Sequence, residues 1–502
     1  MKILQNFILS VFIFFILASS WAQQVHPNIV IIYVDDLGFG DIGVNGAIGV
    51  ETPNIDKLAS KGINFTDAHA TAATCTPSRY SLLTGSYAFR NNAAILNGDA
   101  PLIMDTEMRT LPDMLKDAGY RTGVVGKWHL GLGDGNTNWN EEVKPGPREV
   151  GFDYSFLIPA TGDRVPTVFL ENQKVIGLDP NDPIIVNYST QIDGYPVGRE
   201  HPELLKQYAD DQHLDAVTNG ISRIGYMKGG ESALWVDEKI PFVLTDKANT
   251  FIEKEKENPF FLFFSLHDIH QPRIANVKFI EASTMGPRGD VIAQMDWCVG
   301  EVMNKLEALG LAENTIIIFT SDNGPILDDG YLDYARELVG DHKPAGPFRG
   351  SKYSVYEAGT RMPTILSWPA QIKKPMTSDA LLSQVDLYAS LAKLVKQPVK
   401  KNDAPDSENH LDAWLGKTEK AREFLLQEAY TYGLRMGSWK YIQPKKSDEV
   451  PLWIVNKFVD PGFSTEVQLY DLENDPAENT NIYKEHPEVV AKMEKKLAEI
   501  LK

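Results

Sequence analysis

Cysteine is scarce in this chain of 502 residues, which contains only Cys75 and Cys298. At most one disulfide is possible, and only an oxidising compartment would favour it. Positive charge is also low, because 49 Lys and Arg residues are set against 68 Asp and Glu, giving a formal net charge of −19. A chain this acidic repels a phosphate backbone, so we expect no nucleic-acid partner, and an anionic substrate needs local positive charge.

Long apolar runs are absent beyond residue 22, so we expect no membrane span. Before that point Lys2 is the only charged residue, an apolar run covers residues 7–18, and residues 20–22 are Ser-Trp-Ala. The run is short for a bilayer span, and small residues two positions apart suit signal peptidase. We therefore predict a signal peptide over residues 1–22 and an exported mature protein, periplasmic or secreted.

The composition lacks the bias of a disordered or low-complexity chain, since 43% of the residues are hydrophobic and 23% are charged. Short and almost continuous apolar runs occur at Asn28–Val34, Pro259–Leu266 and Thr315–Thr320. This pattern is typical of strands that are buried on both faces, as in a parallel sheet. Shorter candidate strands are Arg121–Val125 and Thr364–Ser367.

Helical patterns separate these runs, at Asn54–Ser60, Thr110–Ala118, Lys239–Glu257 and Asp290–Leu309. The alternation predicts an α/β fold in which a large, mostly parallel sheet lies between helices, with the ligand site at the carboxyl ends of the strands. From about residue 422 short alternating runs precede an amphipathic helix over Pro487–Leu501. We predict a large domain over residues 23–420 and a small C-terminal α+β subdomain over residues 421–502.

The most informative segment covers residues 75–85, Cys-Thr-Pro-Ser-Arg-Tyr-Ser-Leu-Leu-Thr-Gly. A lone cysteine is more often a small buried core residue than a reactive one. Here Pro77 suits an early helical turn, and Arg79 follows Cys75 by one turn. The segment therefore predicts a cation beside the Cys75 sulfur at a helix N-terminus, where backbone N–H groups also favour an anion.

Residues 75–85 resemble the sulfatase signature Cys-x-Pro-Ser-Arg-x-x-x-x-Thr-Gly at every fixed position. Residues 119–129 match a second signature of that family, Gly-Tyr-x-Thr-x-x-x-Gly-Lys-x-His. Two signatures in the right order and spacing are far more specific than either alone. The chain thus resembles the formylglycine-dependent sulfatases of the alkaline-phosphatase-like superfamily, over nearly the whole of the mature sequence.

The resemblance implies a fold and an activity. The implied fold is the alkaline-phosphatase-like α/β fold, which agrees with the alternating pattern. In that family a maturation enzyme converts the motif cysteine to formylglycine, an aldehyde whose hydrate attacks the sulfur of a sulfate ester. The resemblance therefore implies that Cys75 supplies the nucleophile. A disulfide with Cys298 would prevent the conversion of Cys75 to formylglycine. We therefore expect Cys298 to be an ordinary core residue.

Acidic and amide side chains follow two of the predicted strands. Asp35 and Asp36 come directly after one, and Asp322 and Asn323 after another. Such residues also cap helices and form turns. Four oxygen ligands, without His or Cys pairs at zinc spacing, favour Ca²⁺ over Zn²⁺. The resemblance implies that these four, with converted Cys75, bind a calcium ion that orients the nucleophile and offsets sulfate charge.

The resemblance also implies a group of cations around the sulfate. Lys127 and His129 end the second signature, and we expect Arg79 and His129 to support the nucleophile. Lys352 taken alone is more often a solvated surface residue. Its segment, however, is similar to the family pattern Lys-x-x-x-x-Glu-Gly-Gly-x-Arg, with Ala358 in place of one glycine. We therefore assign Lys352 to the sulfate and the leaving-group side.

Two histidines follow the Phe-rich strand, at positions 267 and 270. The family commonly has His-x-Pro-His here, and this chain has Ile269 where proline is usual. Histidine suits proton transfer because its pKa lies near neutral pH. We predict that His267 is the general acid that protonates the departing alcohol. For His270 a structural role and a substrate-binding role are equally open.

Recognition of the alcohol depends on loops, and residues 134–198 form a long Gly/Pro/Asn-rich stretch. Neighbouring Asp163 and Arg164 can bind vicinal hydroxyls, or form an exposed ion pair of little consequence. Thr161 falls where some sulfatases place a hydroxyl near the sulfate, and we expect His342 at the rim of the site. The pattern resembles bacterial carbohydrate sulfatases that act on 6-O-sulfated galactose or N-acetylgalactosamine, so a sulfated glycan is the predicted partner.

Two other functions would share some of these sequence features. A formylglycine-dependent phosphodiester or phosphonate hydrolase would share Cys75, although phosphatases of the superfamily typically use Ser or Thr with two Zn²⁺ ions and His-rich ligand sets. A non-catalytic sugar-binding protein would share the export signal and the polar loops. It would have no need for Cys75, Arg79, Lys127 and His129 together.

Overall fold

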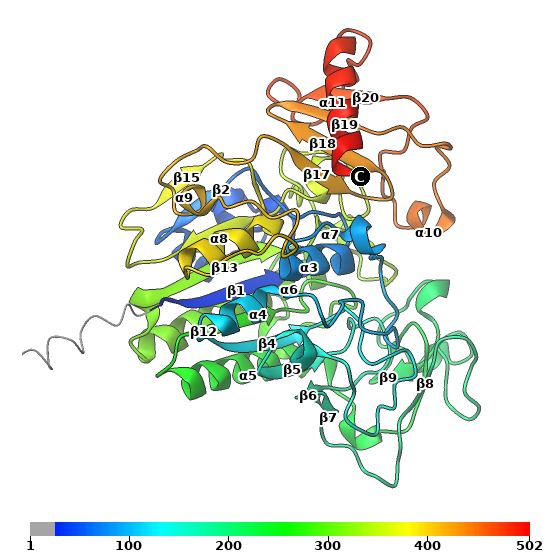
Figure 1. The fold of residues 1–502 in the computed structure, drawn as a ribbon. Coiled ribbons are helices and arrows are strands. Elements are labelled where there is room, and N and C mark those ends of the chain that lie inside the picture. The colour runs from blue at the N-terminus through cyan, green and yellow to red at the C-terminus, as the bar shows by residue number, and fades with distance from the viewer. Residues whose placement is uncertain (1–25) are drawn as a thin grey trace, which may run out of the picture.

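The computed structural model describes residues 26–502, so the predicted signal peptide and its cleavage point lie outside the described residues (Figure 1). A ten-stranded sheet forms the centre of the molecule. From edge to edge its strands are β15 (Met376–Ser378), β2 (Ile63–Phe65), β14 (Thr364–Ser367), β13 (Thr315–Ser321), β1 (Asn28–Val34), β12 (Phe260–Ser265), β4 (Arg121–Lys127), β5 (Tyr154–Ile158), β6 (Leu170–Glu171) and β7 (Lys174–Val175).

The middle of this sheet is parallel. Strand β1 pairs with β13 on one side and with β12 on the other, so that Ile31 lies opposite both Ile318 and Phe263. Strands β4 and β5 continue the parallel order beyond β12. The sheet becomes antiparallel where β14 pairs with β13 and β2, and again at β6 and β7. The predicted mostly parallel sheet is confirmed, and β1 and β14 have the predicted bounds.

Helices cover both faces because successive residues of the buried strands point to opposite sides. Val30 and Ile32 of β1 belong to one core cluster, and Ile29 and Ile31 to the other. The first face carries α2 (Pro53–Ala59), α5 (Ile240–Glu255) and α6 (Gly286–Ala308). The second carries α3 (Cys75–Thr84), α4 (Leu111–Asp117), α8 (Leu387–Leu394) and α9 (Leu411–Trp414). Helix α6 begins before the predicted Asp290 because Pro287 suits its first turn.

Shorter elements lie around the central sheet. Among them are β3 (Ala68–His69) with β16 (Leu382–Ser383), β8 (Ile185–Asn187) with β11 (Tyr226–Lys228), β9 (Val217–Thr218) with β10 (Ile221–Ser222), and the helices α7 (Ala335–Leu338) and α10 (Leu452–Val455). Within residues 26–502 no helix has the length and apolar character needed to cross a bilayer.

A second, antiparallel sheet lies at the C-terminal end, drawn in orange in Figure 1. Its strands are β17 (Leu425–Glu428), β18 (Tyr432–Met436), β19 (Trp439–Ile442) and β20 (Gln468–Asp471), and α11 (Pro487–Ile500) packs on it. The small sheet and terminal helix predicted for this part of the chain are confirmed, although β18 was not singled out as a strand. Arg435 and Lys440 of this sheet bind buried Glu357 at 2.7 and 3.2 Å, which ties the sheet to the central part.

Candidate functional site

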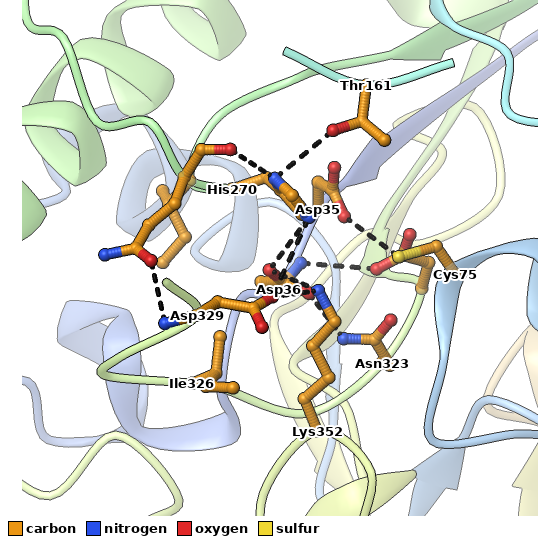
Figure 2. Close-up of polar contacts among 12 residues, drawn as sticks. Asp35, Asp36, Cys75, Thr161, His270, Asn323, Ile326, Asp329 and Lys352 are labelled. Carbon is orange, nitrogen blue, oxygen red and sulfur yellow. Dashed lines mark hydrogen bonds and ion pairs between the residues drawn. The ribbon is translucent and has the colours of Figure 1, made fainter. Parts of the chain in front are cut away.

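The site lies where the parallel strands end. Asp35 and Asp36 follow β1, Asp322 and Asn323 follow β13, and Lys127 is the last residue of β4. Because these strands run in the same direction, their carboxyl ends bring the polar side chains to one edge of the sheet. Figure 2 shows Asp35, Asp36 and Asn323 close to Cys75.

Cys75 is the first residue of α3, as the sequence predicted. Thr74 before it has an extended backbone, and Pro77 lies in the first turn. The Cys75 thiol donates a hydrogen bond to Oδ1 of Asp35 at 3.7 Å, and Thr76 Oγ1 donates to the carbonyl of His129 at 2.9 Å. Burial raises the pKa of the Cys75 thiol despite the nearby lysines, so the unmodified side chain is a protonated thiol and a weak nucleophile.

The expected metal ligands form a compact group. Asp35, Asp36, Cys75 and Asp322 each offer a ligand atom, and these atoms all lie within 4.8 Å of one another. Asn323 Oδ1 is buried and has no hydrogen-bond partner among the described residues, while its amide donates to Asp36 Oδ1 at 2.7 Å. Burial, with repulsion from Asp322, raises the pKa of Asp35. Clustered carboxylates with an unpaired amide oxygen fit a hard cation such as Ca²⁺.

Arg79 binds one of these candidate ligands from inside the fold and does not line the cavity. Its Nε and Nη2 bind Asp322 Oδ2 at 3.0 and 2.7 Å, and Nη1 donates to the Lys127 carbonyl at 3.2 Å. The side chain is fully buried, and its guanidinium is occupied by these partners. Arg79 therefore holds the candidate metal ligands beside Cys75 in place from outside the cavity lining.

The side chains of the other predicted cations lie close to Cys75 or to the candidate metal ligands. Lys127 donates to Asp35, and Lys352 Nζ lies 2.9 Å from Asp36 Oδ2. His129 has φ of 54°, a left-handed conformation that is costly for a bulky residue and is often found at functional sites. Its Nε2 lies 2.9 Å from the Leu96 carbonyl, and its buried Nδ1 has no partner among the described residues.

His267 and His270 have different surroundings. The ring of His267 packs against Gly162, where an added Cβ would come within 2.5 Å of it, and burial lowers the pKa of His267 to about 3. His270 instead lines the cavity beside Cys75, with Nε2 3.8 Å from Asp36 Oδ2 and 3.9 Å from Asp329 Oδ2 (Figure 2). Of these two histidines only His270 lines the cavity. The predicted general acid, His267, does not line it.

The reason lies in the turn after β12. The backbone N–H of Asp35 donates to the Asp268 carbonyl, and the N–H of Ile269 donates to the Asp35 carbonyl. These two bonds hold the chain against the end of β1, so that the ring of His270 projects toward Asp36. Burial lowers the pKa of His270, with the charge of Lys352 acting in the same direction.

A cavity of about 760 Å³ opens in front of these groups. Cys75, His129 and Lys352 line it. So do Asp163 and Arg164, whose Oδ2 and Nη1 lie 2.6 Å apart in a buried ion pair. The predicted pair is therefore not an exposed surface contact.

Three other predicted residues have clear places. Thr161 donates to Asp163 and lies 3.4 Å from Nδ1 of His270, so it belongs to the wall. The expectation that His342 lies at the rim is not met. Its Nε2 lies 2.8 Å from buried Asp41 and its Nδ1 accepts from the Ile48 N–H, which leaves no ring nitrogen for a substrate. Cys298 is a free, buried residue of the core, as expected.

Three more polar residues line the cavity: Asp329, whose segment was expected at the rim, and Lys457 and His213, which were not foreseen from the sequence. Asp329 lies 2.8 Å from Lys352 Nζ, and Lys457 Nζ lies 2.9 Å from the other oxygen of Asp329. His213 lies 3.5 Å from Asp163, and its carboxylate partners raise the pKa of His213 although burial opposes them. Each comes from a loop without a local motif, so only the folded chain brings them together.

Comparisons with known proteins agree with this geometry. Residues 27–397 match the family model described as Sulfatase, and residues 350–502 match the model described as N-sulphoglucosamine sulphohydrolase, C-terminal. The N-acetylgalactosamine-6-O-sulfatase of Bacteroides thetaiotaomicron is 51% identical over 478 residues, which is 94% of this chain and 93% of that protein. The N-acetylgalactosamine-6-sulfatase of Mus musculus is 31% identical, over 72% of this chain and 61% of that one.

A solved structure from Bacteroides thetaiotaomicron, described under metabolism of multiple glycosaminoglycans, has the same architecture. Its TM-score is 0.93 at 50% sequence identity, and the match covers 95% of this chain and 99% of that one. The match to the Sulfatase model spans most of the chain and includes both signatures, Asp35, Asp36, Asp322 and Asn323. This chain belongs to the sulfatase family and is a sulfuric ester hydrolase.

Proposed function

We propose that this protein removes a 6-O-sulfate from an N-acetylgalactosamine or galactose residue of a glycan, with Cys75 acting as formylglycine beside a bound Ca²⁺. One observation carries the proposal: Cys75 begins a helix at the cavity, within 4.8 Å of the ligand atoms of three aspartates, and Lys352 and His270 line the same cavity. The choice of sugar is supported by the bacterial relative at 51% identity.

The converted Cys75 would supply an aldehyde hydrate as nucleophile, and Ca²⁺ would supply positive charge for a sulfate oxygen. Asp35, Asp36, Asp322 and Asn323 would hold the ion, since they offer oxygen donors at the strand ends. Arg79 keeps Asp322 in place through two hydrogen bonds. Its contribution to the reaction is therefore to position a ligand.

Lys127 and Lys352 provide the fixed positive charge that a sulfate needs in an acidic protein. Both ammonium groups are buried and already paired with aspartates, which holds their positions before the substrate arrives. His129 lies beside Cys75 in the cavity wall with an unpaired Nδ1. This nitrogen accepts the proton of the nucleophile.

His270 is assigned the general-acid role that the sequence had given to His267. Its Nε2 faces Asp36 and Asp329 in the cavity, where the leaving oxygen would lie. A bound sulfate ester adds negative charge beside the ring and raises the pKa of His270 from its low value in the free protein. The imidazolium then donates its proton to the departing sugar oxygen.

The sugar itself would meet the other wall of the cavity. Asp163 and Arg164 offer a carboxylate and a guanidinium in a fixed geometry, which suits a pair of neighbouring hydroxyl groups. His213 holds Asp163 from behind. Cys75 is only 2% exposed, so its conversion by a formylglycine-generating enzyme would precede folding, and export would follow.

The test measures sulfate release after co-expression with a formylglycine-generating enzyme. The substrates are galactose and N-acetylgalactosamine sulfated singly at O3, O4 or O6, together with a phosphodiester and a phosphonate ester. Mass spectrometry of the peptide that contains Cys75 establishes the aldehyde. Cys75→Ala is the matched control, since it removes the convertible side chain alone.

Release from the 6-O-sulfates that is absent in Cys75→Ala supports the proposal. Turnover of a different regioisomer would replace the sugar assignment and keep the reaction. Faster turnover of the phosphodiester or phosphonate would overturn the sulfatase assignment. Binding of the glycan without turnover, unchanged in Cys75→Ala, would indicate a sugar-binding protein instead.

A further inference from the structure

Three aromatic rings, of which the middle one contacts the other two, lead from the site toward the surface. Tyr353 is 5% exposed, and its hydroxyl donates to Asp329 at 3.1 Å. Trp453 of α10 packs against it at right angles, with the ring centroids 5.2 Å apart. The ring of Tyr430 also packs against Trp453, with the centroids 5.8 Å apart, and Tyr430 is 48% exposed. All three residues line the cavity, so this wall is continuous from Asp329 to the cavity mouth.

The backbone holds Tyr430 in an unfavourable conformation. Its φ of 58° lies in the left-handed region, which is uncommon for a bulky residue and costs on the order of 1–3 kcal/mol. The carbonyl of Tyr430 accepts a hydrogen bond from Lys445 Nζ at 3.2 Å, which fixes the turn after β17. The strained backbone thus keeps a large, half-exposed ring at the mouth of the cavity, where burial alone would not place it.

The cavity has room for more than the sulfated sugar. Pockets of roughly 300–1,000 Å³ enclose most of a drug-sized ligand, and this cavity has a volume of about 760 Å³. The groups that would bind sulfate gather around Cys75 and Lys352. Phe89 and Tyr432 also line the cavity, and their ring centroids lie 6.0 Å apart. Aromatic walls with few polar groups suit the apolar face of a pyranose ring.

We propose that Tyr430, supported by Trp453, binds the sugar residue next to the sulfated one, so that the preferred substrate is an oligosaccharide. This inference rests on the proposed function, because the sulfated residue must first occupy the Cys75 end. The second sugar lays its C–H face on the ring of Tyr430 and turns its hydroxyl groups to water. Tyr430 therefore determines chain-length preference and takes no part in the reaction itself.

The experiment compares two substrates, N-acetylgalactosamine 6-sulfate and a trisaccharide that carries the same residue at its non-reducing end. The matured wild type is expected to show a higher kcat/KM on the trisaccharide. Tyr430→Ala should reduce kcat/KM on the trisaccharide about tenfold, equal to ~1.4 kcal/mol, and leave the monosaccharide value unchanged. Tyr430→Phe keeps the ring and should retain the wild-type preference.

Tyr334 offers a matched control. It has the same φ of 58° and is 56% exposed, but it lies outside the cavity lining. Tyr334→Ala thus reproduces the loss of an exposed tyrosine at a left-handed backbone position, and should leave both substrates unaffected. Circular dichroism and thermal unfolding of both alanine variants establish that they fold.

The outcomes separate the two proposals. If the wild type hydrolyses neither 6-sulfate, the proposed function itself fails. If it hydrolyses both with equal kcat/KM, or if Tyr430→Ala lowers the two values equally, the second sugar site is wrong and the sulfatase function stands. If Tyr430→Phe behaves as Tyr430→Ala does, the hydroxyl group rather than the ring is responsible, and stacking on Tyr430 is wrong.

Discussion

The ammonium of Lys457 lies 2.9 Å from Oδ1 of Asp329, in an ion pair that is almost completely buried. Lys457 follows α10 in the C-terminal part of the chain, whereas Asp329 follows β13 of the central sheet. Lys352 binds the other oxygen of the same carboxylate at 2.8 Å. These lysines hold the pKa of Asp329 well below its usual value against the effect of burial. A segment far from both sulfatase signatures thus sets the charge beside the reacting group.

Lys457→Met tests this contribution. Without Lys457, buried Asp329 and Asp36 share the single charge of Lys352, so we expect a loss of up to about 3–5 kcal/mol in unfolding free energy. Turnover should fall as well, because Asp329 then binds Lys352 more strongly and leaves less of its positive charge for the sulfate. Urea unfolding and sulfate release measure the two effects. Lys446→Met is the control, since that lysine is exposed on the same segment. Equal stabilities of the two variants would contradict the prediction.

His270→Ala and His267→Ala distinguish the two candidate acids. Loss of a general acid costs about 10²–10⁴-fold in rate, and the cost is smaller for a leaving group that needs no proton. We therefore expect His270→Ala to be severely impaired on a sugar sulfate and far less impaired on 4-nitrophenyl sulfate. His267→Ala should lower stability without this dependence on the leaving group. A leaving-group dependence in His267→Ala would restore the original assignment.

The sequence was most informative about the buried strands. The runs at Asn28–Val34 and Thr364–Ser367 became β1 and β14 without a change of bounds, because strands covered on both faces need continuous apolar residues. The predicted C-terminal sheet is present, but the sequence did not reveal its strand β18, where the side chain of Arg435 is buried by pairing with Glu357. An ion pair between distant residues cannot be read from a local pattern.

The same distinction holds for the site. Cys75, Asp35 and Lys352 lie in motifs or at strand ends, and the structure brings them together as expected. The choice between the two histidines after β12 depended on backbone bonds to Asp35, which no local pattern specifies. The family resemblance placed Arg79, one helical turn from Cys75, among the cations around the sulfate. In the fold its guanidinium reaches Asp322 instead.

Calcium removal tests the role of Asp35, Asp36, Asp322 and Asn323 as metal ligands in a way that does not depend on turnover. With the ion absent, three buried carboxylates and the unpaired Asn323 oxygen lie close together, so Ca²⁺ should raise the thermal unfolding temperature of the chelator-treated protein. At a concentration 100 times the dissociation constant the stabilisation is about 2.7 kcal/mol. Asn323→Ala should require more Ca²⁺ for the same shift. An unfolding temperature that does not change with Ca²⁺ would contradict the assignment of these residues.

Glu428 makes stability depend on pH in a direction that can be stated in advance. It lines the cavity, its Oε1 accepts the Ala88 N–H at 3.1 Å, and burial raises the pKa of Glu428 from its usual 4.5 to about 8. Between pH 4.5 and about pH 8 the folded state therefore binds more protons than the unfolded state. This group favours folding most below pH 4.5, and that contribution is lost as pH rises to about 8.

Glu428→Gln removes the charge and keeps an oxygen for the Ala88 N–H. The variant should be more stable than the wild type by about 1–3 kcal/mol at pH 8, and the difference should shrink as the pH falls toward 5. Thermal unfolding at several pH values measures this difference. Glu423→Gln, at an exposed position just before β17, controls for the loss of one negative charge. Parallel pH curves for wild type and Glu428→Gln would mean that Glu428 is ionised in the folded protein, with its carboxylate solvated at the cavity wall.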